Sequence, residues 1–495
     1  MSRRVILNSP AQPREMSLHL RLEISERRLL LRAGDLTLTA VAVLGALWLW
    51  ARLAARPLDL ALLQEQLGWV ALIGLGWPLW LTLVDMYNLR LVARVGPSVR
   101  RILIGGLVLL FGYLIIFFIT SRAPVTGALA TIEIGAPPLR FAPGLAIVAS
   151  MALIMAWRLL YIRVLGAPHT RRRLLILGAG QAGSALSHVI LKGHGPYYDI
   201  VGFVDDIPVP RCDQIGDVPV LGGTDRLGDL IWEHRIDEII IASSGEVSGE
   251  TLQILMDCYE HGIAITPMPL LYERLTGKIA VEHVGSQWYV ALPLQPRQAR
   301  TAEEALKRML DIAGGLLLAV LLLVLLPFIA AAIRLDSPGP VVYRQERVGR
   351  RGTRFTVLKF RSMLNDAERD GEAQWAAKDD PRVTRVGRWL RRTRLDELPQ
   401  AINVLRGEMS LVGPRPERPE FVAHLQETIP FYRTRLAARP GLTGWAQINY
   451  GYGDSVDAAL AKLQYDLYYL KHQSFWFDVL ILARTVHVVL LMKGQ

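Results

Sequence analysis

Four long apolar stretches in the first third of the chain constrain its fold more than any other feature. They lie at residues 36–53, 68–87, 103–120 and 143–165. Each approaches the roughly 20 apolar residues that a helix needs to cross the hydrocarbon core of a bilayer. Over the whole chain 51% of the residues are hydrophobic and the mean hydropathy is +0.27. We therefore expect a four-helix transmembrane domain at 35–166 rather than one large soluble core.

The arginines between these stretches predict their orientation. Three segments are rich in arginine: the one before the first stretch, the one between the second and third, and the one after the fourth. The other two loops contain only Arg52 with Arg56 and Arg122 with Arg140. Because positively charged loops stay in the cytoplasm, we expect segment 1–34 and the chain after the fourth helix to be cytoplasmic. The rich segments contain Arg3, Arg4, Arg14, Arg21, Arg27, Arg28 and Arg32; Arg90, Arg94, Arg100 and Arg101; and Arg171, Arg172 and Arg173.

Residues 171–296 have the pattern of an α/β domain. Mostly apolar runs at 174–177, 200–204 and 238–242 have the length of buried strands, and helical segments lie between them. Strands that alternate with helices predict a parallel, doubly wound sheet. We therefore expect a Rossmann-like cytoplasmic domain after the membrane helices.

A glycine turn in this domain has the spacing of a dinucleotide site. Gly178, Gly180 and Gly183 follow the first strand and open a helix, and Asp205 ends the second strand. In such sites the glycines let the backbone approach a pyrophosphate, and the acidic residue binds the ribose. The same glycines also occur where a helix only packs tightly on a strand. Both interpretations stay open, so these four residues are candidate nucleotide-binding residues.

A fifth apolar run extends without a charge from 312 to 333, but it contains Pro327. Proline removes a backbone donor and clashes with the preceding turn, which kinks a helix. If the run crossed the membrane, five nearby arginines would follow it on the outer face, against the positive-inside rule. We therefore predict a re-entrant helix at about 305–334, broken at Pro327; the alternative is an ordinary kinked span. The five arginines are Arg344, Arg347, Arg350, Arg351 and Arg354.

The adjacent carboxylates Asp396 and Glu397 are the strongest chemical signal. They lie in the sequence TRLDELPQ at 393–400, close to Arg391 and Arg394. Nearby positive charge keeps a carboxylate ionised. An ionised carboxylate beside a divalent cation can bind the metal, attack phosphorus, or do both. We therefore predict Asp396 and Glu397 as catalytic and metal-binding residues.

Three motifs around this pair present polar and cationic side chains from turns. They are KFRSM at 359–363, GPRPE at 413–417 and RPGLTGWAQI at 439–448. Rigid turns that hold arginine suit phosphate recognition, because the guanidinium fork matches phosphate oxygens. The formal net charge of +11 also favours anionic partners, while no motif of nucleic-acid recognition accompanies it. The candidate substrate- and phosphate-binding residues are Lys359, Arg361, Arg415, Arg439 and Gln447.

With these motifs, residues 300–495 resemble the catalytic domain of bacterial polyprenyl-phosphate hexose-1-phosphate transferases, the monotopic phosphoglycosyl transferases. The whole chain resembles the larger members of exopolysaccharide biosynthesis, which carry four N-terminal spans and a Rossmann-like central domain. The resemblance implies an α/β catalytic domain with a re-entrant membrane helix. The matching segments are 343–349, 359–363, 380–387, 395–400, 410–417 and 439–448.

The resemblance also implies a mechanism. In this family the aspartate of the pair attacks the β-phosphoryl group of a UDP-sugar, UMP leaves, and undecaprenyl phosphate takes the sugar phosphate from the covalent phosphosugar–aspartyl intermediate. Asp396 is then the nucleophile, Glu397 its partner in metal binding or positioning, and Pro327 the helix break. Mg²⁺ is the implied cofactor, and the site faces the cytoplasm at the bacterial inner membrane. Lys359, Arg361 and Arg415 are the implied phosphate-binding residues.

The glycine turn supports a rival hypothesis, a membrane-anchored NAD-dependent sugar-nucleotide oxidoreductase or dehydratase. No tyrosine in the chain is followed four residues later by lysine, so the catalytic pair of that superfamily is missing. The sequence does not identify the sugar, although the resemblance favours UDP-glucose first. It does not set the oligomeric state either, although a homodimer formed through the central domain is compatible with it.

Overall fold

The computed structural model describes residues 22–122, 141–166, 170–206, 214–243, 248–283, 301–364 and 380–490, apart from 56, 58, 61–63, 65, 452 and 454. Most of the predicted segment 1–34 therefore lies outside the described residues. The chain divides into two compact units. The first comprises Met1–Ser243 and Val247–Thr266, and the second comprises Ser244–Glu246 and Pro267–Gln495.

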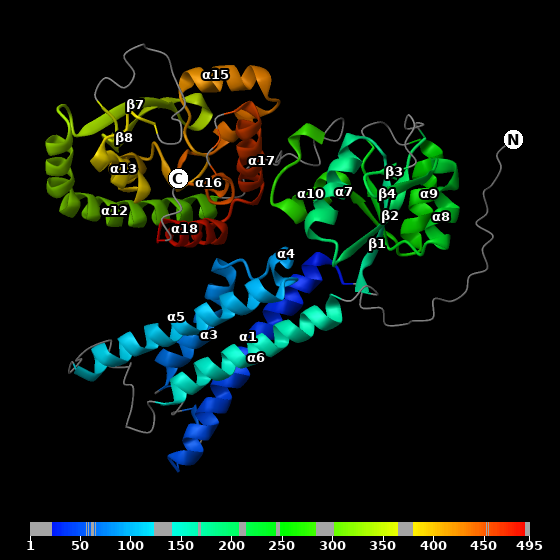
Figure 1. Ribbon diagram of the computed structural model, residues 1–495, viewed down its shortest axis with the longest axis horizontal. Helices are drawn as coiled ribbons and strands as arrows, with labels where there is room; N and C mark the ends of the chain where they lie inside the picture. The colour runs from blue at the N-terminus through cyan, green and yellow to red at the C-terminus, as the bar shows by residue number, and fades with distance from the viewer. Residues whose placement is uncertain are drawn as a thin grey trace. The chain divides into compact units, whose positions relative to one another are not determined.

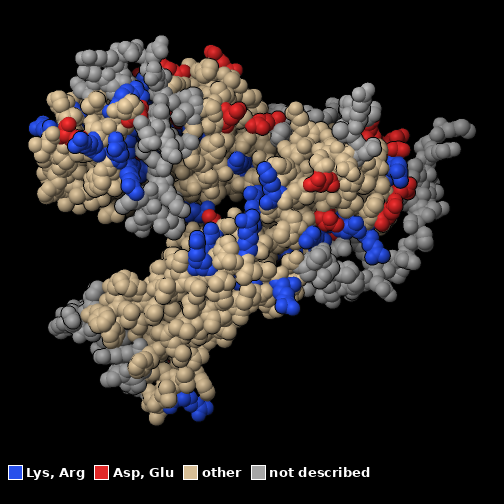
Figure 2. Space-filling view, in the orientation of Figure 1, with Lys and Arg blue, Asp and Glu red and all other residues tan. Residues whose placement is uncertain are grey.

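Four apolar helices of the first unit confirm the predicted membrane bundle (Figure 1). α1, α5 and α6 are long and apolar enough to cross a bilayer. α3 has 17 residues and extends about 25 Å, somewhat less than the roughly 30 Å of a hydrocarbon core. Figure 2 shows α5 and α6 as a surface almost without charged side chains. The helices are α1 (Ile24–Leu53), α3 (Leu67–Leu83), the short α4 (Leu89–Val92), α5 (Val95–Arg122) and α6 (Phe141–Leu165).

Buried polar contacts connect the helices of this bundle. Arg158 of α6 forms an ion pair with Asp35 of α1, and both side chains are 1% exposed. Trp77 of α3 donates from Nε1 to Oγ of Ser150 on α6, at 2.6 Å. Polar side chains inside a membrane bundle pair with one another, because lipid offers them no partner.

A six-stranded sheet completes the first unit. Its strand order is β3-β4-β2-β1-β5-β6. β1 is parallel to β2 and β5, β2 is parallel to β4, and β3 is antiparallel to β4. The order β4-β2-β1-β5-β6 corresponds to the 3-2-1-4-5 order of doubly wound nucleotide-binding folds. The elements are β1 (Arg172–Leu177), α7 (Gln181–Gly193), β2 (Tyr198–Val204), β3 (Gln214–Ile215), β4 (Val218–Gly222), η4 (Thr224–Arg226), α8 (Leu227–Glu233), β5 (Glu238–Ile241), α9 (Gly249–Glu260) and β6 (Ala264–Pro267).

The second unit is built from short strands and helices around a long helix. β7 and β8 form an antiparallel pair, and β9 and β10 form a parallel one. Its elements are α10 (Met268–Thr276), η5 (Val281–His283), α12 (Thr301–Asp336), β7 (Val342–Val348), η8 (Arg350–Gly352), β8 (Arg354–Phe360), α13 (Arg385–Arg392), η9 (Leu395–Gln400), α14 (Ala401–Arg406), β9 (Ser410–Val412), α15 (Pro419–Thr428), η10 (Tyr432–Ala437), β10 (Gly441–Thr443), α16 (Trp445–Asn449), α17 (Val456–His472) and α18 (Phe475–Leu490).

Both ends of α12 contact this same unit. Near its start, Asp311 accepts hydrogen bonds from the Ser410 hydroxyl at 2.8 Å and from the Leu411 N–H at 2.9 Å. At its end, the carboxylate of Asp336 accepts from the Val386 N–H at 2.9 Å. Figure 1 shows that α12 bends between the two ends. Between these contacts the helix exposes large apolar side chains, among them Leu317, Leu323 and Phe328, each more than 70% exposed.

Candidate active site

The carboxylate pair lies at a sharp turn between two helices. α13 ends before Arg394, which adopts the left-handed conformation with φ +59°. The next residues, including Asp396 and Glu397, form the 3₁₀-helix η9, which leads directly into α14. A non-glycine residue with positive φ is strained, and such strain is common at functional sites. Here the turn places both carboxylates inside the fold, 8% and 7% exposed respectively.

Glu397 is surrounded by cations. Its Oε1 accepts a hydrogen bond from Arg415 Nη2 at 2.7 Å, and it lies 3.5 Å from Lys359 Nζ and 3.9 Å from Arg394 Nη1. Burial alone raises the pKa of Glu397, but the charges of Arg415, Lys359 and Arg394 outweigh burial and hold that pKa well below its usual range. Glu397 is therefore ionised and fixed in place.

Asp396 has the opposite environment. Its Oδ1 is buried and has no hydrogen-bond partner among the described residues. Burial and the negative charge of Glu397 raise the pKa of Asp396 to about 6, although Lys359 and nearby arginines oppose the change. A buried carboxylate oxygen without a partner is costly. It is also available to form a bond to a substrate or to a metal ion.

Lys359 reaches the pair from strand β8. It is cross-strand to Tyr343 of β7, and its side chain is 23% exposed. Burial lowers the pKa of Lys359; the negative charge of Glu397 opposes this, and the positive charge of Arg415 adds to it. A lysine beside two carboxylates supplies a positive charge that a phosphate can share.

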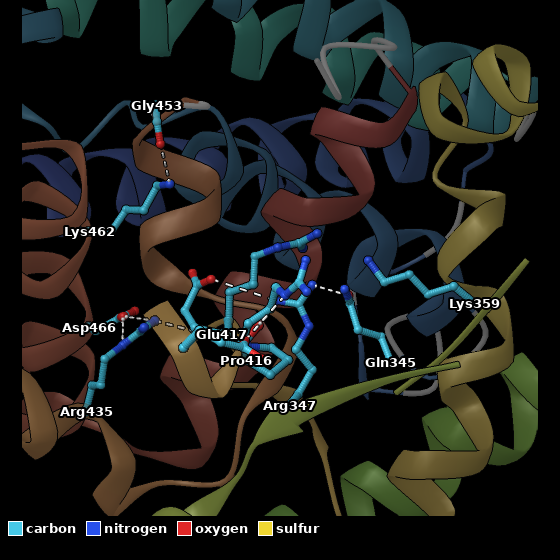
Figure 3. Close-up of polar contacts among 12 residues, drawn as sticks. Gln345, Arg347, Lys359, Pro416, Glu417, Arg435, Gly453, Lys462 and Asp466 are labelled. Atoms are coloured by element: carbon cyan, nitrogen blue, oxygen red, sulfur yellow. Dashed lines mark hydrogen bonds and ion pairs between the residues drawn. The ribbon is translucent and has the colours of Figure 1, made fainter. Parts of the chain in front are cut away.

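Arg347 is a site residue that we did not single out from the sequence. Its Nη2 donates to Gln345 Oε1 at 2.5 Å and its Nη1 donates to the Pro416 carbonyl at 3.2 Å. Figure 3 shows these contacts, together with Glu417 beside Arg347 and Lys359 nearby. The sequence signal for Arg347 was the alternation of side chains between the two faces of a strand, which puts Tyr343, Gln345 and Arg347 on one face of β7. Tyr343 pairs with Lys359 across the two strands, so this face lies on the side of Lys359.

Arg415 is positioned by a close backbone crossing. A Cβ atom at Gly413 would meet the carbonyl oxygen of Arg439 at 2.3 Å, so only glycine fits there. The Gly413 N–H donates to the Thr443 carbonyl at 2.9 Å. On the other side, buried Arg435 donates to the Arg415 carbonyl at 3.0 Å. The segment that carries Arg415 is thus held from both sides.

Three predicted phosphate-binding residues make other contacts. Arg361 is buried and donates to the carbonyl oxygens of Ser337 and Pro338, at 2.6 and 3.0 Å, where α12 ends. Arg439 lines a separate pocket of about 180 Å³ with Lys307 and Arg350. Gln447 donates to the Leu442 carbonyl at 3.2 Å, and its Oε1 is buried without a partner among the described residues. No contact links these three side chains to Asp396 or Glu397 in the described part of the chain.

The residues present fit a magnesium ion that is completed by substrate. Mg²⁺ commonly binds one or two carboxylates and takes its other oxygens from phosphates and water. The buried, unpartnered Oδ1 of Asp396 suits such a ligand, and Glu397 can offer its second oxygen. Within the described residues no group of three or more His, Cys, Asp or Glu side chains could hold a metal alone. An ion here would therefore depend on the substrate's oxygens.

The glycine turn of the central sheet is closely packed. Gly178 has φ +111°, and a Cβ at Gly183 would meet the Gly178 carbonyl oxygen at 2.2 Å. The carboxylate of Asp205 accepts a hydrogen bond from the Ala179 N–H at 2.7 Å. These contacts account for two of the three glycines and for Asp205 by packing. Gly180, where a Cβ would meet nothing within 4 Å, is not explained in this way.

Comparison with known proteins gives two family matches. Residues 302–492 match the model of the bacterial sugar transferase family, and residues 144–269 match a model described as a CoA-binding domain. The first match includes every predicted catalytic and phosphate-binding residue. The second covers most of α6 and the central sheet.

Several characterised proteins are similar over most of the chain. A UDP-N-acetylgalactosamine-undecaprenyl-phosphate N-acetylgalactosaminephosphotransferase of Aeromonas hydrophila is 40% identical over 299 residues, 60% of this chain and 67% of the relative. An undecaprenyl-phosphate glucose phosphotransferase of Komagataeibacter xylinus is 34% identical over 68% of this chain and 63% of the relative. A UDP-glucose:undecaprenyl-phosphate glucose-1-phosphate transferase of Xanthomonas campestris pv. campestris is 30% identical over 73% and 76%.

Proposed function

Because this chain belongs to the bacterial sugar transferase family, we propose that it transfers a hexose 1-phosphate from a UDP-sugar to undecaprenyl phosphate and releases UMP. The observation that carries the proposal is the buried carboxylate pair, in which Glu397 is fixed by cations and Asp396 keeps an unpartnered oxygen. We propose this reaction as the first membrane step of exopolysaccharide assembly.

Asp396 is the nucleophile in this proposal. One of its carboxylate oxygens bonds to the β-phosphorus, while the bond from that phosphorus to the bridging oxygen breaks and UMP leaves with the bonding electrons. An oxygen of undecaprenyl phosphate then bonds to the same phosphorus, and Asp396 departs as a carboxylate. A carboxylate nucleophile divides one displacement into two easier ones.

The neighbouring cations stabilise the phosphoryl group during both steps. Lys359 and Arg415 already meet at Glu397, within 3.5 and 2.7 Å. Preorganised positive charge is worth most in a site that excludes water. A bound Mg²⁺, held by Asp396 and Glu397, would neutralise further charge on the diphosphate. Glu397 holds Lys359 and Arg415 in position before the substrate binds.

We propose that α12 enters and leaves the membrane on the cytoplasmic face. In a straight helix Asp311 and Asp336 would be 25 residues and about 38 Å apart, more than the roughly 30 Å of a bilayer core. Yet Asp311, in the third turn of α12, and Asp336, at its end, both bond to the rest of the catalytic unit. Pro327 lies between them, inside a helix that continues from Thr301 to Asp336, and in this proposal it supplies the bend. We place the catalytic unit on the cytoplasmic face of the inner membrane in this proposal, and the arginine-rich loops support that orientation.

UDP-glucose is the first donor to test, because two of the three relatives described above are glucose phosphotransferases by name; UDP-N-acetylgalactosamine is the second. The experiment incubates the purified chain with undecaprenyl phosphate, Mg²⁺ and a panel of UDP-sugars, and measures UMP. We expect UMP release with one hexose donor and none with Asp396→Asn. Repeated turnover, with more than one UMP released per protein molecule in the absence of undecaprenyl phosphate, or no UMP with any donor, would overturn the proposal.

The rival oxidoreductase hypothesis gains no support. The similar proteins are named as phosphotransferases, and in the structure Asp205 bonds to the turn itself. The same reaction mixture tests the rival directly, because reduction of added NAD in the presence of a UDP-sugar would favour it.

A further inference from the structure

The helix that follows the central sheet packs on the catalytic unit. β6 ends at Pro267 and α10 begins at Met268, yet α10 lies in the second compact unit. In a doubly wound fold the helix after a strand normally covers the sheet. Here Glu273 of α10 bonds to α17, and Gly277 at the end of α10 bonds to Trp445 of α16.

Glu273 fixes α10 to the end of α17. This carboxylate is 5% exposed. It accepts a hydrogen bond from Lys471 Nζ at 2.9 Å and contacts His472 Nε2 at 2.6 Å. Burial raises the pKa of Glu273, but the hydrogen bonds from His472 and Lys471 outweigh burial, so the net change in that pKa is downward. A buried, paired carboxylate of this kind fixes geometry, because removing its charge leaves its cationic partners without a counterion.

The chain after α10 continues into the catalytic core. The Ile279 N–H donates to the Gln464 carbonyl of α17 at 3.1 Å. Ile279 and Val281 are buried in one cluster with Leu463 and Leu467 of α17 and with Val348 of β7. Residues 268–283 therefore supply part of the hydrophobic core that supports β7.

Gly277 connects this segment to Trp445. α10 ends at Gly277 in the left-handed conformation, with φ +67°, and its carbonyl accepts a hydrogen bond from Trp445 Nε1 at 3.0 Å. The Trp445 ring packs on Phe477, with 5.0 Å between centroids. It also belongs to the cluster that contains Leu411 and Val412 of β9. Trp445 thus joins the segment after α10 to the strand that leads to the active site.

The same contacts extend to the carboxylate pair. β9 pairs with β10, and the Gly413 N–H donates to the Thr443 carbonyl at 2.9 Å. The Gly441 N–H donates to the Pro414 carbonyl, also at 2.9 Å. Arg415 follows directly and donates to Glu397. An unbroken series of hydrogen bonds and packed side chains therefore runs from Gly277 through Trp445 to Arg415.

We propose that residues 268–283 belong structurally and functionally to the transferase domain. In this proposal Trp445, held by the Gly277 carbonyl, is a positioning residue for Arg415. Only one part of this inference rests on the proposed function, namely that holding Arg415 in place matters for sugar phosphate transfer. The structural consequence concerns the order of the 410–415 backbone and does not need a substrate.

The test uses the full-length chain in lipid nanodiscs and hydrogen–deuterium exchange without substrate. Trp445→Phe keeps a ring but loses the donor, and the matched control is Trp476→Phe, which alters a side chain that is 77% exposed. We expect exchange at 410–415 to become about fivefold faster in Trp445→Phe, the effect of losing one net hydrogen bond, and to stay unchanged in Trp476→Phe. Unchanged exchange at 410–415 in Trp445→Phe would overturn the proposal.

A second pair of variants covers the case in which Trp445→Phe does not fold. Glu273→Gln removes the buried charge, and Glu260→Gln removes an exposed one on α9. We expect faster exchange at both 268–283 and 410–415 in Glu273→Gln alone. If only 268–283 responds, α10 is not coupled to the site and the proposal is wrong. If exchange behaves as expected but the parent releases no UMP, the proposed function fails while this structural inference stands.

Discussion

At the scale of single residues, Asp396 and Glu397 show how the pKa values of adjacent carboxylates can be shifted in opposite directions. Arg415 and Lys359 contact Glu397, whereas Oδ1 of Asp396 contacts no donor among the described residues. We expect Asp396→Asn to abolish UMP release and the covalent intermediate, because an amide oxygen cannot replace the carboxylate as nucleophile. Mass spectrometry of the intact protein after mixing with a UDP-sugar measures the intermediate. Asp457→Asn, an exposed change on α17, is the control and should keep full activity.

The pH dependence of the reaction reports on the same residue. The pKa of Asp396 is raised to about 6, and only its ionised form attacks. We therefore expect kcat/KM to fall about tenfold per pH unit below pH 6 and to level off above it. Glu397→Gln removes a negative neighbour that raises this pKa, so the inflection should move to lower pH although the rate itself drops. An inflection that stays in place would contradict the assignment.

Arg347 supplies a prediction that the sequence alone did not suggest. Its guanidinium is held beside Pro416 and Glu417, close to Lys359 (Figure 3). We expect Arg347→Gln to raise KM for the UDP-sugar by about 10-fold or more, since a hydrogen bond to a charged group contributes roughly 1.5–3 kcal/mol. The matched control is Arg344→Gln, because Arg344 is exposed and on the opposite face of β7. Equal effects of the two substitutions would indicate only a general loss of charge.

At the scale of elements, α12 decides on which side of the membrane the catalytic unit lies. A cysteine added after Gln495, in a background with Cys212→Ser and Cys258→Ala, can be tested with a membrane-impermeant reagent in intact cells. We expect no labelling of this position, and labelling of Ala128→Cys in the loop predicted to face outward. Pro327→Leu restores the missing backbone donor, so part of the population should become labelled and activity should fall. Labelling with Pro327 intact would mean that α12 crosses.

At the scale of the whole molecule, substitutions at the glycine turn of the central sheet can distinguish effects on folding from effects on catalysis. A Cβ at Gly183 would meet a backbone oxygen at 2.2 Å, whereas a Cβ at Gly180 would meet nothing within 4 Å. We expect Gly183→Ala to destabilise the first unit by about 1–3 kcal/mol and Gly180→Ala to change neither stability nor UMP release. Thermal unfolding and kinetics of both variants provide the measurement. A specific loss of transfer in a stable Gly180→Ala protein would point to a ligand at this turn.

Periodicity and local composition were enough to predict much of this molecule. The apolar stretches became α1, α3, α5 and α6, and the strand-like runs became β1, β2 and β5 of a doubly wound sheet. Such features depend on short-range rules: the length of a bilayer core, the alternation of strands and helices, and the conformational limits of glycine and proline. The carboxylate pair was likewise evident, because Asp396 and Glu397 are adjacent in the chain.

Only the tertiary structure decided which distant side chains meet. Arg361 lies in a motif that suits phosphate, yet it bonds to the carbonyl oxygens at the end of α12. In the sequence, nothing distinguished Arg347 from the other arginines that follow the apolar run at 312–333, yet it lies in the site. α10 follows the central sheet in sequence but packs on α17. Each outcome depends on contacts between residues far apart in the chain. Local sequence limits which partners a side chain can accept, but the packing of the whole unit selects among them.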